Sequence, residues 1–123
     1  MIDTVCFINL EENDKDLILS FALDDGDGCV RSLILHRALF FERIMPEEER
    51  GTKVSLEGEE LENEQEHLNI LEEFQFDGDI LRIKSKFRLY EVDARKLDSE
   101  DFKVIKQALA RQNTDARFQV KFT

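Results

Sequence analysis

Carboxylates are the side chains of this sequence best suited to acid–base chemistry. Because 28 of the 123 residues are Asp or Glu, some pairs will lie at general acid–base distances by chance, and such pairs do not indicate an enzyme. Glu72 stands out, because strand alternation places it among apolar residues, where burial would raise its pKa. A bulge or a hairpin edge would instead let it reach water. The sequence has no GxSxG elbow, phosphate-binding loop or HExxH motif, so we predict no catalytic residues and no enzymatic activity.

Residues that can bind metals are not spaced as a metal site requires. Cys6 and Cys29 lie in apolar stretches without CxxC spacing, and His36 and His67 are 31 positions apart. The acidic loop 24–28 lacks the Glu that a calcium loop has at its twelfth position, where counting from Asp24 or Asp25 gives Leu35 or His36. We therefore predict no metal and no cofactor. We interpret both cysteines as core residues, although a disulfide between them stays open, and His36 as a hydrogen-bonded core residue.

Basic side chains alternate along the segment 81–90 and could bind an anion. On a strand they would share one solvated face, where Glu73 would lie across from Arg82 or Lys84, depending on the register of the hairpin. No aromatic residue is interleaved on that face to stack a base, so we predict no binding of nucleic acid. The row consists of Arg82, Lys84, Lys86 and Arg88.

Charge is distributed unevenly over a chain whose net charge is −11. Residues 1–79 carry 6 basic and 22 acidic side chains, a net charge of −16, whereas residues 80–123 carry 11 and 6, a net charge of +5. An acidic surface repels phosphate backbones and steers a basic partner toward itself, with association that weakens as salt rises. Plain solubility is the alternative interpretation of this acidity.

Most of the elements that position these side chains are predicted to be strands, and two of them form a hairpin. The runs 68–76 and 81–90 flank Asp77 and Gly78, a dipeptide typical of hairpin turns. A two-residue turn would pair Phe74 with Leu81. A four-residue loop would instead pair Phe76 with Leu81, Phe74 with Ile83, Ile70 with Phe87 and Leu68 with Leu89. The two registers keep the same faces, and both stay open.

The remaining chain predicts more strands and one helix. Apolar runs or alternation indicate strands near 4–10, 17–23, 30–41, 52–56 and 118–122, with a surface turn or short helix over 42–51. A helix over 99–112 is indicated by apolar spacing of three and four and by a cap at Asp98 or Ser99. We predict a single domain, residues 1–123, of the α+β class: a mainly antiparallel β-sheet of about 6–8 strands with one C-terminal helix packed on one face.

Two further features bear on the compartment. The first ten residues do not resemble a secretory signal, and no apolar run approaches the roughly 18 to 20 residues that span a bilayer. We therefore predict a cytoplasmic protein that does not enter a membrane.

The run 57–66, with six glutamates in ten residues, predicts a mobile, solvated loop.

One stretch resembles a known family. Residues 17–51 contain an acidic, Gly-rich turn, the run SLILHRAL at 32–39, an acidic segment and Gly51. This order is similar to that of the bacterial toxin-immunity proteins grouped as immunity protein family ten, whose members have three leucine-like residues, Gln-Arg-Ala, an acidic segment and Gly. Residues 79–83 and the C-terminal helix are placed as in those proteins, and the resemblance covers about two thirds of the chain.

The resemblance implies a small protein that neutralises a cognate bacterial toxin by binding it. Many such toxins would be nucleases with basic active sites, which an acidic surface can occupy. The alternative is an acidic, homodimeric secretion chaperone or adaptor, and an enzyme with an unrecognised site ranks behind both. The oligomeric state stays open. On the immunity hypothesis the partner-binding residues are Glu47, Glu48, Glu49, Glu57, Glu59, Glu60, Glu62, Glu64 and Glu66.

Overall fold

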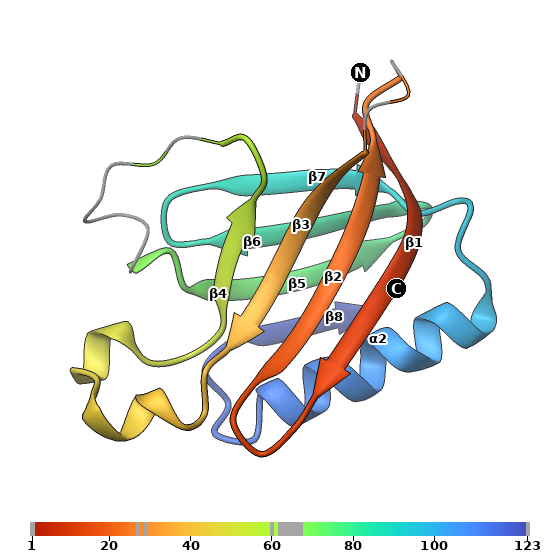
Figure 1. Ribbon diagram of the computed structural model, residues 1–123. Coiled ribbons are helices and arrows are strands. Elements are labelled where there is room, and N and C mark those ends of the chain that lie inside the picture. The colour runs from red at the N-terminus through yellow and green to blue at the C-terminus, as the bar shows by residue number, and fades with distance from the viewer. Residues whose placement is uncertain (1, 27, 29, 60, 62–67, 123) are drawn as a thin grey trace.

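The computed structural model describes residues 2–26, 28, 30–59, 61 and 68–122. Within these residues it contains eight strands, one α-helix and two short 3-10 helices (Figure 1). The strands are β1 (Asp3–Glu12), β2 (Leu17–Asp24), β3 (Val30–Arg37), β4 (Lys53–Leu56), β5 (Leu71–Asp77), β6 (Ile80–Ser85), β7 (Leu89–Asp93) and β8 (Gln119–Phe122). The helices are η1 (Phe41–Ile44), η2 (Glu47–Glu49) and α2 (Ser99–Gln112).

All eight strands form one sheet in the order β4-β3-β2-β1-β7-β6-β5-β8. Neighbouring strands are antiparallel except for β1 with β7 and β5 with β8, which are parallel. The fold is therefore α+β, with a mainly antiparallel sheet and one helix close to the C-terminus, as predicted. The two parallel pairs join segments far apart in the sequence, and no local signal predicts them.

The sheet curls back on itself, so that β1–β4 lie across β5–β7 in Figure 1. The backbone N–H of Val54 donates to the carbonyl of Asn69 at 3.0 Å, and the N–H of Leu71 donates to the carbonyl of Thr52 at 2.7 Å. These bonds bring the free side of β4 against the chain that enters β5. The space enclosed between the two halves of the sheet is the core.

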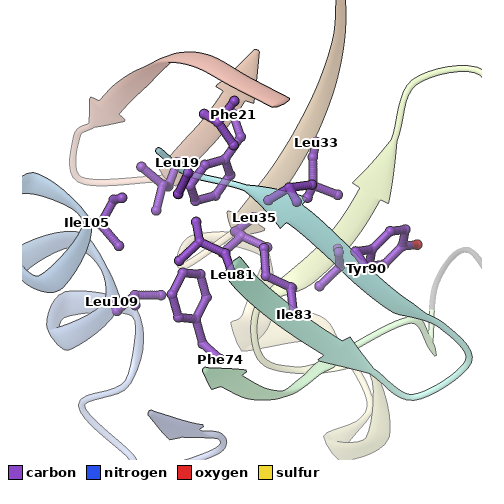
Figure 2. Packing of buried hydrophobic residues seen from close by; sticks show 14 of the residues in the cluster. Leu19, Phe21, Leu33, Leu35, Phe74, Leu81, Ile83, Tyr90, Ile105 and Leu109 are labelled. Atoms are coloured by element: carbon purple, nitrogen blue, oxygen red, sulfur yellow. The ribbon is translucent and has the colours of Figure 1, made fainter. Parts of the chain in front are cut away.

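Side chains from both halves and from α2 fill this core (Figure 2). The rings of Phe21 on β2 and Phe74 on β5 stack with centroids 6.4 Å apart. Helix α2 packs against β1 and β2 and contributes the buried residues Ile105 and Leu109. One cluster of buried residues therefore connects every large part of the described chain.

Helix α2 forms where its local signals predict it. The carboxylate of Asp98 accepts the N–H of Asp101 at 2.9 Å, and the carboxylate of Asp101 accepts the N–H of Asp98 at 3.0 Å. This reciprocal capping box satisfies two N–H groups at the start of the helix. Ile105, Ala108 and Gln112 then recur on one buried face.

The β5–β6 hairpin has the register that follows from the four-residue loop. Phe76 pairs with Leu81 and Phe74 with Ile83, around a turn in which Gly78 has a φ of 64°. The pairing of Phe74 with Leu81 is therefore wrong. A bulge between Leu71 and Glu73 shifts the register, and Glu72 is exposed there rather than buried among apolar neighbours.

Two predicted strands are shorter than expected. The run 81–90 breaks after Ser85, where the Ser85 N–H donates to the Arg88 carbonyl at 2.9 Å, and β7 begins only at Leu89. The expected pairs of Ile70 with Phe87 and of Leu68 with Leu89 are consequently wrong, and Ile70 instead bridges to Lys53. Strand β3 ends at Arg37, and the chain turns away from the sheet before 41.

Of the helices in the described part of the chain, none combines the length and apolar composition needed to cross a membrane.

Candidate protein-binding surface

The connection between β3 and β4, residues 38–51, projects from the curled sheet in Figure 1 and is called the β3–β4 lobe below. It contains both 3-10 helices, with Pro46 directly before η2. Proline is compatible with the first position of a helix but not with a strand interior, so the sequence favours short helical turns here. The predicted surface turn or short helix over 42–51 is therefore confirmed.

Four large apolar side chains of this lobe face solvent. They are exposed by 36% for Leu39, 48% for Phe40, 51% for Phe41 and 82% for Ile44. The rings of Phe40 and Phe41 meet edge to face, with centroids 5.5 Å apart. These four residues are called the apolar patch. The prediction of a strand over 30–41 is therefore wrong for three of them, Leu39, Phe40 and Phe41, because β3 ends at Arg37. The Pro and Glu residues that follow are the signal in the sequence for this earlier end.

Three of the predicted partner-binding glutamates follow the apolar patch within the same lobe. Glu47 and Glu48 are exposed, and Glu49 is half-buried. One carboxylate oxygen of Glu47 accepts a hydrogen bond from Arg117 at 2.8 Å, and the other lies 3.4 Å from the guanidinium of Arg50. The lobe therefore combines apolar and acidic side chains on one projection.

The other predicted glutamates follow β4. Glu57 is exposed, whereas Glu59 is half-buried and accepts the hydroxyl hydrogen bond of Tyr90 at 2.6 Å. Burial, followed by the bond to Glu59, raises the pKa of Tyr90 above its ordinary value. The carboxylate of Glu59 is thus held by the protein itself. Glu60, Glu62, Glu64 and Glu66 lie outside the described residues, together with most of the predicted mobile loop 57–66.

Arg37 anchors the base of the lobe, a role that no motif in the sequence predicts. Its buried guanidinium donates two hydrogen bonds to the carboxylate of Glu42, at 2.9 and 3.0 Å, and two to Asp115, both at 2.8 Å. A fifth bond, at 2.6 Å, goes to the carbonyl of Gln112 at the end of α2. All the donors of this arginine are aligned with acceptors, which is what makes its burial tolerable.

Charge pairing shifts the pKa values of two members of this group, Arg37 and Asp115. The hydrogen bonds to Asp115, and those to Glu42 after them, raise the pKa of Arg37 above its ordinary value. The hydrogen bond from Arg37 likewise holds the pKa of the Asp115 carboxyl well below its usual range. The three side chains Arg37, Glu42 and Asp115 are called the Arg37 clamp below.

Further contacts fix both ends of the lobe. The backbone N–H of Gly51 donates to the carboxylate of Glu42 at 3.2 Å, so the clamp also holds the chain where it leaves the lobe. The N–H of Phe40 donates to the carbonyl of Lys15 at 3.2 Å. The cations of Lys15 and Arg43 lie 5.6 and 5.9 Å from the centre of the Phe40 ring, at distances that permit cation–π attraction.

Two of the four residues of the basic row, Arg82 and Arg88, form surface ion pairs. Arg82 donates to Glu91 at 3.2 Å and to Asp77 at 3.1 Å, and Arg88 lies 3.6 Å from Glu59. Lys84 and Lys86 are exposed, and Lys86 lies 5.5 Å from the ring of its neighbour Phe87. This arrangement fits the solvated face that alternation indicated.

The histidine and cysteine predictions fare differently. His36 is hydrogen-bonded as predicted, to Asp16 at 2.8 Å, but its side chain is half-exposed, so its interpretation as a core residue is wrong. Cys6 is a half-buried free thiol, and Cys29 lies outside the described residues. Across the part of the chain that the structure describes, no three His, Cys, Asp or Glu residues are grouped closely enough to hold a metal ion.

A hollow of about 400 Å³ lies beside β3 and β4 and is lined by His36, Lys53 and Glu59 together with apolar side chains. The imidazole is bound to Asp16 and the carboxylate of Glu59 to Tyr90, so two of these polar groups are already engaged by the protein. The hollow thus offers a weaker case for a functional site than the β3–β4 lobe.

No protein-family model, curated protein or solved structure matches this chain. The resemblance to the immunity proteins therefore stays a prediction.

Proposed function

We propose that this protein is an inhibitor that acts in the bacterial cytoplasm and neutralises a toxin by binding its basic surface. The observation that carries the proposal is the projection of Glu47, Glu48 and Glu49 on the β3–β4 lobe, within the first 79 residues, whose net charge is −16. A lobe that extends from a rigid sheet can reach into a concave site on another protein. Carboxylates at its surface can take the places that a nuclease reserves for phosphate groups.

Electrostatic steering explains why such a protein would be this acidic. Complementary charge raises association rate constants to as much as about 10⁸–10⁹ M⁻¹s⁻¹ at low salt, against about 10⁵–10⁶ M⁻¹s⁻¹ without it. Speed matters for an inhibitor, because each active toxin molecule does damage until it is bound. The same charge repels nucleic acid, so the inhibitor would not be diverted by the toxin's substrate.

The test is the rate of association with the partner. Tagged protein captures partners from the source lysate in low salt, and the purified partner is then mixed with two triple variants in a stopped-flow experiment. The lobe variant is Glu47→Gln, Glu48→Gln and Glu49→Gln. The control, Asp79→Asn, Glu91→Gln and Glu100→Gln, removes the same charge from exposed positions outside the lobe.

We expect the lobe variant to associate about tenfold more slowly than the control at low salt and to lose much of the salt dependence. The wild-type protein should also abolish the toxic activity of the captured partner. Equal rates for the two variants would place the acidic contact elsewhere. A captured partner without a basic surface, or one whose activity survives binding, would refute the inhibitor proposal.

The apolar patch favours one second candidate, a homodimeric adaptor or secretion chaperone, because such a protein needs an exposed apolar surface for a dimer or a client peptide. Light scattering of the purified protein distinguishes the two. A dimer across a range of concentrations favours the adaptor, and a monomer favours the inhibitor.

A further inference from the structure

We propose that the apolar patch is the anchor of the binding surface and that it enters an apolar socket bordered by Lys and Arg on the partner protein. This inference deepens the proposed function and rests on it for the presence of a basic protein partner. It assigns different roles to two parts of the lobe. The apolar patch supplies most of the affinity, and the glutamates raise the association rate constant and select for a basic partner.

Exposure is the first observation that supports an anchor. Large apolar residues scattered singly over a surface are ordinary, but here four of them fall within six positions of the chain, and Ile44 is exposed by 82%. Burying such side chains releases roughly 25 cal/mol per Å² of apolar surface. Residues that dominate protein–protein affinity are typically aromatic, and Phe40 and Phe41 supply two exposed aromatic rings.

Preorganisation is the second observation. Glu42 lies between Phe41 and Arg43 in η1. Its carboxylate accepts hydrogen bonds from the guanidinium of Arg37 and from the N–H of Gly51. Phe40 is held by its backbone bond to Lys15 and by two cations near its ring. An apolar patch that is already ordered loses less conformational entropy when it binds.

Charge decides which occupant fits the apolar patch. Residues 38–51 carry four glutamates against two arginines, a net charge of −2, and they belong to the first 79 residues, whose net charge is −16. Glu42 is bound to Arg37 and Glu47 to Arg117, so Glu48 and Glu49 are the carboxylates of the lobe that we expect to meet the partner. A second copy would bring the same carboxylates and another net charge of −11 against it. Nucleic acid and anionic membranes are repelled for the same reason. An apolar socket bordered by Lys and Arg complements both the apolar side chains of the patch and the carboxylates beside it.

Site-specific crosslinking tests the position of the anchor. The photoreactive amino acid p-benzoylphenylalanine is introduced at Phe41, and in a control at Gln107, an exposed position on α2, in cells of the source organism. The partner is identified by mass spectrometry and purified. We expect a crosslink from position 41 but not from position 107, to apolar residues of the partner that lie within a Lys- and Arg-rich surface.

Affinity measurements with the same partner separate the two roles. The variant Phe41→Ser, Ile44→Ser removes side chains that are exposed by 51% and 82%, so its urea midpoint should fall only slightly below that of the wild type. We expect about 100-fold weaker binding, mostly through faster dissociation, with an unchanged salt dependence of association. The triple glutamate variant of the lobe should show the opposite pattern, with slower association and a flattened salt dependence.

Several outcomes would overturn the anchor. A crosslink between two copies with a dimer in solution, a crosslink to lipid or nucleic acid, or a partner socket bordered by Asp and Glu would each refute it. If the serine variant binds as tightly as the wild type while the glutamate variant associates slowly, the anchor is refuted and the proposed inhibitor stands. If neither variant affects binding, the anchor is refuted and the contact lies outside the lobe; the inhibitor proposal is then decided by whether the partner's toxic activity survives binding.

Discussion

At the scale of single residues, Arg37 is the side chain whose surroundings matter most for the candidate surface. It joins β3 to Glu42 in the lobe and to Asp115 beyond α2, in a buried position. A lysine cannot reproduce the two paired bonds of a guanidinium, and it would leave one carboxylate of the clamp without a donor.

We predict that Arg37→Lys lowers the free energy of unfolding by about 2–3 kcal/mol, as expected when a buried charge network is broken. The matched control is Arg82→Lys, which also contacts two carboxylates, Asp77 and Glu91, but at the surface. Exposed ion pairs contribute at most about 1 kcal/mol, so the control should change stability by less than this. Urea unfolding measures both variants, and equal losses would show that the clamp is not a structural anchor.

At the scale of elements, the β3–β4 lobe depends on the backbone at Gly51. This glycine has a φ of 114°, a conformation that other residues rarely adopt, and a Cβ there would lie 3.1 Å from the Cγ2 of Ile70. Its N–H also holds Glu42. In the β5–β6 turn, Gly78 has a φ of 64°, and a Cβ there would meet no atom within 4 Å.

We predict that Gly78→Ala lowers the free energy of unfolding by about 1 kcal/mol, the usual cost of the left-handed region for a residue with a Cβ. Gly51→Ala should cost about 2 kcal/mol more, because the backbone is strained further and Ile70 must move. Denaturant midpoints measure the difference. Equal midpoints for the two variants would contradict the close packing at the base of the lobe.

At the scale of the whole molecule, the two halves of the curled sheet share one core, and this predicts a single cooperative unfolding transition. The chain has one tyrosine and no tryptophan, so Tyr90 fluorescence reports on β7 alone, whereas far-UV circular dichroism reports on the whole backbone. Phe74, which stacks on Phe21 across the core, is fully buried and connects the two halves.

We predict that both probes give the same urea midpoint in the wild type. Phe74→Ala should shift the two midpoints together and lower the free energy of unfolding by about 3–5 kcal/mol, the typical cost of removing a buried ring. Two separate transitions, or a shift in one probe only, would show that the halves unfold independently and that the chain is not one cooperative domain.

The sequence alone determined the features that depend on neighbours in the chain. The capping residue Asp98 and apolar spacings of three and four defined α2, and the glycine of the β5–β6 turn together with alternation defined the hairpin. The acidity of the first part of the chain, and hence the kind of partner proposed, is likewise a property of composition. These signals act over a few residues or over the whole chain, so no tertiary contact is needed to recognise them.

Only the tertiary structure decided where similar apolar residues lie. Leu33 and Leu35 are buried, whereas Phe40 and Phe41, a few positions later, face solvent. The difference arises because β3 ends at Arg37, whose guanidinium is held by a carboxylate 78 positions away in the chain. Periodicity cannot reveal a partner so distant, nor the parallel pairs that curl the sheet. The glutamates of the candidate surface could therefore be predicted from the sequence, whereas the exposure of its apolar patch could not.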